Sequence, residues 1–175
     1  MEKIRKTSKI ILLFNIIVLI YLIFTFFDNQ KIEIENQFLK QKIGMTEGRY
    51  KFIVRIMPTV DDFCREIPVD KWCIITQICH ETNFGRSRIA KENNNLFGIR
   101  QDGRYAHFKN REECLRRWYQ IIAYSGNKHY RRALNCMYAD DYEGYFRNVQ
   151  TGGWANDKIY AAKCTKLYQS IRRGY

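Results

Sequence analysis

The sequence predicts a mainly α-helical domain with a reduced β-hairpin lobe, preceded by one transmembrane helix. Apolar residues recur every three or four positions through most of the chain after residue 50, which indicates amphipathic helices. Only residues 99–108, with Gly103 in the middle, read as a hairpin. Residues 10–27 contain no charged side chain. These three observations define the expected architecture, and the segments below are taken in chain order.

Residues 1–27 have the pattern of a membrane anchor. Residues 10–27, at ~1.5 Å per residue, nearly span a hydrocarbon layer of ~30 Å. No small-residue cleavage site follows, so we expect an uncleaved signal anchor rather than a removable signal peptide. Residues 1–9 contain Lys3, Arg5, Lys6 and Lys9 and should stay in the cytoplasm. The chain is therefore expected to cross the cytoplasmic (inner) membrane once, with its domain on the periplasmic or extracellular side.

A linker and the first helices come next. Residues 28–48 are polar and end between glycines, which predicts a stalk, and the globular domain is expected over residues 49–175. Residues 52–67 should form a helix that contains Pro58 and stops before Pro68.

Residues 72–85, WCIITQICHETNFG, predict a mostly buried helix capped by Asp70. Its one acid is Glu81, in the last turn before Gly85, which is suited to a left-handed stop. Apolar neighbours and the negative end of the helix dipole should both favour the neutral acid. Glu81 is therefore a candidate general acid, although a glutamate near a helix end is more often a solvated surface residue.

The rest of the chain alternates turns and short helices. Three asparagines, residues 93–95, suit a tight turn whose side chains bond the backbone. Asn110 and Glu113 have capping-box spacing. The expected elements are a helical turn at 87–92, the hairpin at 99–108, helices at 110–122, 130–139 and 141–150, the turn TGGWAND, and a last helix at 160–171.

The charge balance narrows the class of partner. The chain has 30 Lys and Arg against 18 Asp and Glu, a net charge of +12, which favours an anionic partner. No nucleic acid is expected, because the predicted anchor places the domain outside the cytoplasm. Anionic lipid headgroups and cell-wall carboxylates fit that compartment, and a basic surface that only aids solubility is an equal alternative.

Cysteine and histidine spacing indicates neither a metal nor a cofactor. Six cysteines permit up to three disulfides in an oxidising compartment. Cys73 and Cys79 lie ~9 Å apart along one helix and cannot pair with each other. Cys114 and Cys164 lie on apolar helical faces, where free cysteine is a small core residue, so both redox states remain open. No CxxC pair occurs and no histidine follows His80 four residues later, so zinc is unsupported.

Residues 52–168 resemble the glucosaminidase family of peptidoglycan hydrolases, the autolysin and flagellar rod-cap type, within the lysozyme-like superfamily. The resemblance rests on IPVDKWCIITQICHETNFGRSRIAKENNNLFGIR, the Tyr105 to Phe108 aromatic pair, the helix from Glu112 to Ile122, and GGWANDKIYAAKCTKLYQSI. It implies a lysozyme-like helical domain that cleaves the β-1,4 bond after N-acetylglucosamine in peptidoglycan glycan strands, with Glu81 as general acid.

The resemblance also implies roles for other residues. Asn94, Asn95, Phe97 and Gly98 match the turn that lines the cleft floor. Tyr105 and Trp154 are candidates for stacking on sugar rings, although Trp154 stands where the family usually has an active-site tyrosine. Tyr160 matches a later family tyrosine that is expected mostly to pack.

The second catalytic group is open. Family members commonly have a longer β-lobe, and here its only acid is Asp102. Asp102 could activate water if the two carboxyls lay roughly 6.5–9.5 Å apart. Alternatively the 2-acetamido oxygen of the substrate could attack, and the short lobe favours this second hypothesis. Glu112, Glu113 and Asp157 are weaker candidates, because all three fit helix starts.

Other functions remain compatible with these residues. A muramidase or lytic transglycosylase of the same superfamily would cleave a different glycosidic bond, so a different sugar would carry the chain end that cleavage creates. A non-catalytic peptidoglycan-binding module would keep the cleft without the chemistry. A structural subunit of an envelope-spanning machine would use the anchor and stalk for assembly.

Overall fold

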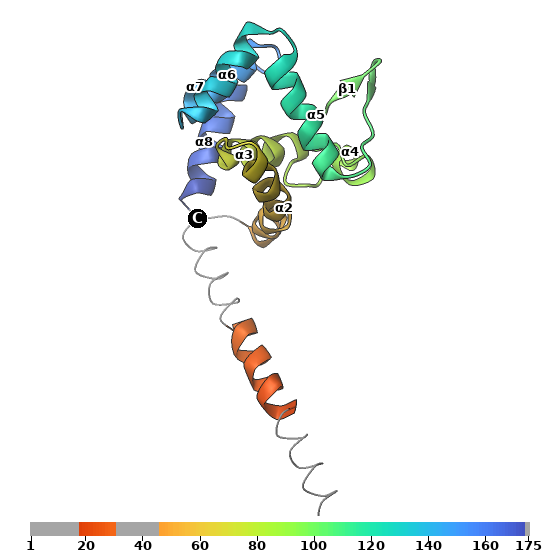
Figure 1. The fold of residues 1–175 in the computed structure, drawn as a ribbon, viewed down its shortest axis with the longest axis vertical. Coiled ribbons are helices and arrows are strands. Elements are labelled where there is room, and N and C mark those ends of the chain that lie inside the picture. The colour runs from red at the N-terminus through yellow and green to blue at the C-terminus, as the bar shows by residue number, and fades with distance from the viewer. Residues whose placement is uncertain (1–17, 31–45, 174–175) are drawn as a thin grey trace, which may run out of the picture. The chain divides into compact units, whose positions relative to one another are not determined.

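The computed structural model describes residues 18–30 and 46–173, which belong to two separate compact units (Figure 1). Residues 18–30 are helical. Within the described ranges, no helix has the length and apolar character needed to cross a bilayer. The basic tail 1–9, the first part of the predicted span 10–27 and most of the linker 28–48 lie outside the described residues.

The domain opens with two helices that the sequence predicts. Helix α2, Glu47–Glu66, begins two residues before the expected domain start and contains Pro58. Pro58 is exposed, so water can reach the carbonyl that the proline leaves without a donor. Helix α3, Lys71–Thr82, is capped as expected, because the Asp70 side chain accepts the backbone N–H of Trp72.

Helix α3 ends earlier than the left-handed stop expected at Gly85. The chain turns left-handed at Asn83 (φ 48°), and Phe84 and Gly85 also have positive φ. The stop therefore begins two residues before Gly85. Glycine is still required at 85, because a Cβ there would overlap the ring of Phe52.

The short helix α4, Arg88–Glu92, and a two-stranded antiparallel hairpin follow. Strand β1, Arg100–Gln101, pairs with β2, Arg104–Tyr105. Asp102 and Gly103 join them with φ of 51° and 77°, the signature of a type I′ turn.

Four further helices complete the domain: α5, Arg111–Tyr124; α6, Lys128–Tyr138; α7, Tyr142–Thr151; and α8, Tyr160–Arg172. Asn110 caps α5 by accepting the N–H of Glu113, and the Glu113 carboxylate accepts the N–H of Lys109. Asp157 does not cap α8 itself, because its carboxylate accepts the N–H of Ile159, which precedes the helix.

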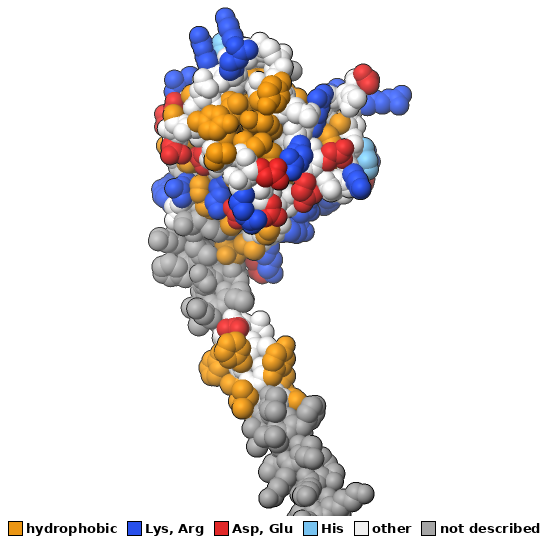
Figure 2. Space-filling view, in the orientation of Figure 1, with side chains coloured by type: hydrophobic (Ala, Val, Ile, Leu, Met, Phe, Trp, Pro, Cys, Tyr) orange, Lys and Arg blue, Asp and Glu red, His pale blue; other side chains and the backbone are white. Residues whose placement is uncertain are grey.

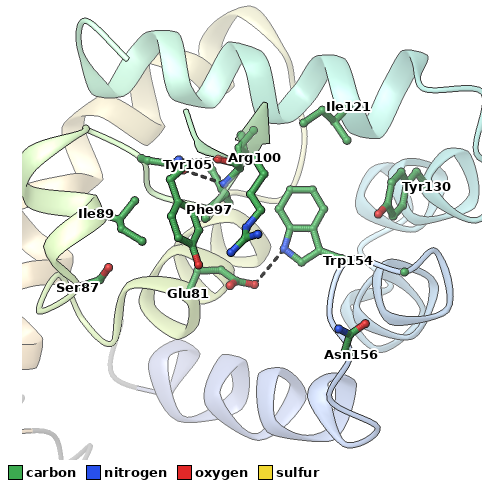
Figure 3. Close-up of a pocket in the computed structure, with 14 residues that line it drawn as sticks. Glu81, Ser87, Ile89, Phe97, Arg100, Tyr105, Ile121, Tyr130, Trp154 and Asn156 are labelled. Atoms are coloured by element: carbon green, nitrogen blue, oxygen red, sulfur yellow. Dashed lines mark hydrogen bonds between the residues drawn. The ribbon is translucent and has the colours of Figure 1, made fainter. Parts of the chain in front are cut away.

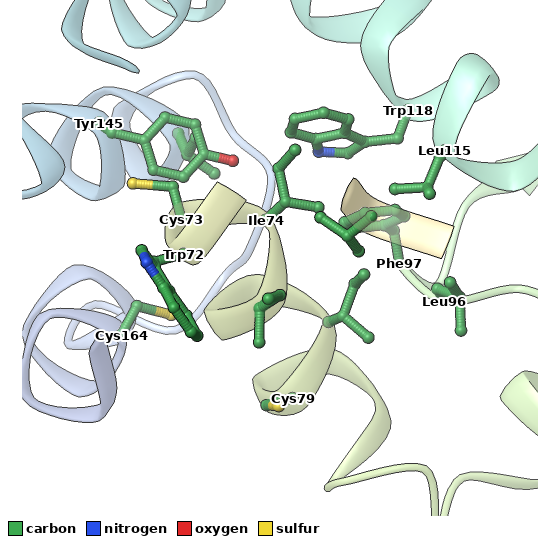
Figure 4. Close-up of a cluster of buried hydrophobic side chains, with 14 of the residues drawn as sticks. Trp72, Cys73, Ile74, Cys79, Leu96, Phe97, Leu115, Trp118, Tyr145 and Cys164 are labelled. Atoms are coloured by element: carbon green, nitrogen blue, oxygen red, sulfur yellow. The ribbon is translucent and has the colours of Figure 1, made fainter. Parts of the chain in front are cut away.

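Helix α3 is the centre of the core. Nine of its residues are buried, and it packs against both α2 and α8. Figure 4 shows its side chains between those of α5 on one side and α7 and α8 on the other. Buried Gln77 accepts a hydrogen bond from the Trp118 indole (3.2 Å) and another from the Tyr145 hydroxyl. The centre of the core is thus crossed by a polar link from α3 to α5 and α7.

All six cysteines lie in described residues and are free thiols, four of them buried. Desolvation raises the pKa of the Cys114 thiol to about 12 and that of Cys164 to about 12. Such thiols are small core residues. Of the two redox states that the sequence leaves open, the structure has the reduced one.

The visible surface of the domain is mixed. Figure 2 shows Lys and Arg side chains distributed over it, together with a patch of hydrophobic side chains over the region between α5 and α6. The net positive charge is therefore not confined to the first residues of the chain.

Candidate active site

Glu81 lies in the last turn of α3, and its carboxylate is held by two side chains from distant segments, of which Figure 3 shows Trp154. The Trp154 indole Nε1 donates to Glu81 Oε1 at 3.0 Å, and the Tyr160 hydroxyl donates to the same oxygen at 2.8 Å. Because both bonds end on Oε1, Oε2 is the oxygen available to carry a proton.

The segment between α7 and α8 brings these two donors to Glu81. Helix α7 ends at Thr151 with Gly152 as its C-cap; a Cβ at Gly152 would overlap the ring of Tyr130, and Gly153 has φ 86°. The chain then reaches Trp154, whose ring meets Phe97 (6.4 Å) and Tyr130 (6.1 Å) edge to face. Glycines at 152 and 153 therefore allow the close turn that places the indole.

Burial raises the pKa of Glu81 above its ordinary value. The two hydrogen bonds, first from Tyr160 and then from Trp154, act in the opposite direction because they favour the carboxylate. The direction agrees with the sequence prediction, and desolvation is the principal cause. A glutamic acid of this kind holds its proton to a higher pH than an ordinary glutamate does, and its carboxylate is stabilised once the proton is lost, as a general acid requires.

Glu81 lies in a cleft of about 800 Å³. The hairpin, α4 and α5 form one part of its wall, and the Gly153–Asn156 segment forms another. Five of the expected site residues line it with Glu81, namely Asn95, Phe97, Gly98, Tyr105 and Trp154. The structure therefore gathers into one cleft residues separated by more than seventy positions in the chain.

The asparagine turn builds the cleft floor from within. Asn95 is 1% exposed; its amide donates to the carbonyls of Ile99 (2.8 Å) and Ala106 (3.0 Å), and its Oδ1 accepts the N–H of Ile99 (2.9 Å). Asn94 does not line the cleft; its φ is 50° and its amide donates to the carbonyl of Phe108 (3.0 Å). Both side chains hold the hairpin against the domain, as the sequence predicts for backbone-bonding asparagines.

Besides Asn94, two more of the expected site residues lie outside the cleft lining. Asp102 is exposed in the turn of the hairpin and is not among the residues that line the cleft. Tyr160 is 1% exposed and sits behind Glu81, so it positions the acid rather than contacting substrate. Its role differs from the packing expected from sequence, because its hydroxyl bonds the carboxylate directly.

The cleft also contains residues that the sequence did not single out. Arg100 is the cation among the described lining residues, and its guanidinium lies 4.6 Å from the centre of the Tyr105 ring. The remaining lining residues are Ser87, Ile89, Ile99, Ile121, Tyr130, Gly153 and Asn156. The only available signal was indirect, because Arg100 ends the LFGIR segment that follows the asparagine turn and Asn156 lies within the WAND segment.

Comparisons with known proteins decide the family. The family model described as mannosyl-glycoprotein endo-β-N-acetylglucosaminidase, the glucosaminidase family, matches residues 57–173. The chain belongs to the glucosaminidase family. It is therefore a glycoside hydrolase by family, and Glu81, Trp154 and Tyr160 all fall within the matched residues.

Relatives of this glucosaminidase chain agree with the assignment. It is 23% identical over 148 residues to the peptidoglycan hydrolase FlgJ of Pseudomonas aeruginosa, a match that covers 70% of this chain and 36% of that protein. The chain thus spans only about a third of that relative's length.

Solved structures show the same fold. The catalytic domain of the autolysin Auto from Listeria monocytogenes superposes with a TM-score of 0.60 at 21% identity, over 74% of this chain and 88% of that one. A peptidoglycan hydrolase from Sphingomonas sp. A1 gives a TM-score of 0.55 at 18% identity, over 69% and 91%.

Proposed function

We propose that this chain is a membrane-anchored peptidoglycan hydrolase that cleaves the β-1,4 bond after N-acetylglucosamine, with Glu81 as the general acid. The observation that carries the proposal is the environment of the Glu81 carboxyl group. Burial raises its pKa, Trp154 and Tyr160 donate hydrogen bonds to its Oε1, and the residue lines a cleft of about 800 Å³. The names of the relatives, a peptidoglycan hydrolase and an autolysin, support peptidoglycan as the substrate.

In the proposed reaction, the Glu81 proton passes to the glycosidic oxygen as the bond from that oxygen to the anomeric carbon breaks. The resulting carboxylate is stabilised by the two hydrogen bonds to Oε1. Glu81 is the only carboxylate among the described residues that line the cleft. This favours attack on the anomeric carbon by the 2-acetamido oxygen of the substrate; water, deprotonated by Glu81, then opens the cyclic intermediate.

Asp102→Asn tests the competing mechanism. Because Asp102 lies at the hairpin tip outside the cleft lining, we expect the variant to keep activity within about twofold of the parent chain. The measurement is the rate at which new reducing ends appear in peptidoglycan. A loss of a hundredfold or more would instead make Asp102 the base for the attacking water.

Tyr160→Phe tests the role of the hydrogen bond to Glu81. That bond lowers the pKa of Glu81, so its loss should raise this pKa further. A general acid stops working as pH rises through its pKa, so the alkaline limb of the rate–pH profile should move to higher pH. Tyr168→Phe is the matched control, since Tyr168 is also on α8 but its hydroxyl donates to Asp70 (2.8 Å). Equal profiles for the two variants would contradict the assignment.

Membrane attachment is part of the proposal. It rests on the charge-free residues 10–27 behind the basic residues 1–9. Residues 28–48 would then act as a stalk between the bilayer and the catalytic domain, and an anchored domain of this kind suits a partner in envelope-spanning machinery. The chain should stay with membranes after carbonate extraction, and recovery in the soluble fraction would count against the anchor.

A lytic transglycosylase is the second candidate, because the same lone carboxylate would also suffice for that chemistry. Mass spectrometry of peptidoglycan digested with the full chain separates the possibilities. New reducing ends on N-acetylglucosamine support the proposal. Reducing N-acetylmuramic acid indicates a muramidase, 1,6-anhydro ends a transglycosylase, and intact glycan a binding module.

A further inference from the structure

A second groove lies on the exposed side of α5, next to the cleft. It has a volume of about 430 Å³ and is lined by Arg117, Gln120, Ile121, Tyr124 and Ser125. Ile121 also lines the active-site cleft, so the two depressions share a wall. Figure 3 shows Ile121 on α5 above Trp154.

Helical spacing explains why these residues form one surface. Residues 117, 120, 121, 124 and 125 are three or four positions apart, so they follow one face of α5. The buried face of α5 carries Cys114, Leu115, Trp118 and Ile122. Groove residues other than Ile121 are exposed, and they lead along the helix from the cleft wall.

Tyr124 gives this groove a fixed aromatic surface. Its side chain is 75% exposed. The ring packs edge to face on Tyr119 at 6.1 Å, and Tyr119 packs in the same way on buried Phe63 at 6.0 Å. Because packing on Tyr119 already restricts the Tyr124 ring, less side-chain entropy is lost when a ligand binds to its exposed face. Such a face suits stacking on the C–H face of a pyranose ring.

Polar groups stand beside that ring. The Arg117 guanidinium donates to the Gln120 side-chain carbonyl at 3.3 Å, so the two side chains present a joined set of donors and an acceptor. This combination of an aromatic face with Arg and Gln matches the hydroxyl and acetamido groups of an N-acetylated amino sugar, and Arg117 also suits the lactyl carboxylate of N-acetylmuramic acid that carries no peptide.

We propose that the Tyr124 groove is a sugar-binding subsite that holds the glycan strand where it leaves the cleft past Ile121. The inference rests on the proposed function, since it takes the cleft to hold the same strand. A polymeric substrate must extend beyond an 800 Å³ cleft, and the shared wall makes the groove its continuation. Long strands would therefore gain affinity from Tyr124 that short oligosaccharides would not.

The test measures binding rather than turnover. The full chain carrying Glu81→Gln, in detergent, is titrated with uncross-linked glycan strands of ten or more disaccharides and, separately, with an N-acetylglucosamine tetrasaccharide. Adding Tyr124→Ala should weaken binding of the long strands by roughly tenfold, the size typical of removing an aromatic contact, and leave tetrasaccharide binding unchanged. Tyr142→Ala is the matched control, because Tyr142 is a partly buried tyrosine on α7 whose ring packs on an aromatic neighbour, Tyr168 (4.2 Å), and it lines neither depression.

The outcomes separate the two proposals. Equal long-strand affinity for the Tyr124 and Tyr142 variants overturns the subsite, as does an equal loss with both glycans. Failure of the wild-type chain to create new ends in peptidoglycan would instead overturn the proposed hydrolysis. The binding comparison would still decide whether the groove holds sugar.

Discussion

Glu81→Gln should lower kcat/KM for peptidoglycan cleavage by about a thousandfold, within the range that a positioned general acid contributes. Glutamine has nearly the same volume as glutamic acid and cannot donate a proton to the leaving oxygen. Its Oε1 can still accept from Trp154 and Tyr160, so the site geometry should be kept. The measurement is the initial rate of new reducing ends, followed together with the unfolding transition. Activity within tenfold of wild type would remove Glu81 from the mechanism.

The same variant has a second expected signature, in stability. Burial raises the folded-state pKa of Glu81 above its ordinary value of 4.5, so the native state holds this proton at pH values where the unfolded chain releases it. Wild-type stability should therefore fall, relative to Glu81→Gln, as pH rises from about 4.5 through the folded-state pKa. Urea unfolding at several pH values between 4 and 8 measures this. A stability difference that does not change with pH would mean that Glu81 is not desolvated.

The sequence was sufficient to predict features that depend only on residues close together in the chain. Asp70 caps α3 and Asn110 caps α5 because capping involves residues two or three positions apart. The Asp102–Gly103 pair gives the hairpin turn for the same reason. Glu81 could be singled out as the candidate acid because it is the only carboxylate in residues 72–85, a segment whose helix is mostly buried.

Features that depend on packing between distant segments could not be derived in this way. Tyr160 reaches Glu81 across 79 positions only because α8 packs on α3, and Trp154 does so across 73. Trp154 was expected to stack on sugar, and its hydrogen bond to the acid could not be read from residue type. The helix dipole was expected to contribute to the raised pKa of Glu81, whereas burial is the principal cause, and burial is set by the whole domain.

Trp118→Ala should lower the free energy of unfolding by about 4 kcal/mol, near the middle of the range for removing a buried tryptophan side chain. Trp118 is fully buried on α5; its ring stacks on Phe97 at 5.1 Å, and its indole donates to Gln77. The substitution leaves a cavity between the core and the cleft floor, which Phe97 helps to form. Urea unfolding of the full chain measures the change.

Trp118→Phe separates the two contributions of this residue. Phenylalanine keeps an aromatic ring against Phe97 but cannot donate to Gln77, so we expect a loss of about 1–2 kcal/mol for the hydrogen bond and the smaller ring. If the stack on Phe97 holds the floor, Trp118→Phe should keep most of the peptidoglycan-cleaving activity at temperatures where both variants are folded, and Trp118→Ala should lose most of it. Equal activity in the two folded variants would show that Trp118 stabilises the domain without shaping the cleft.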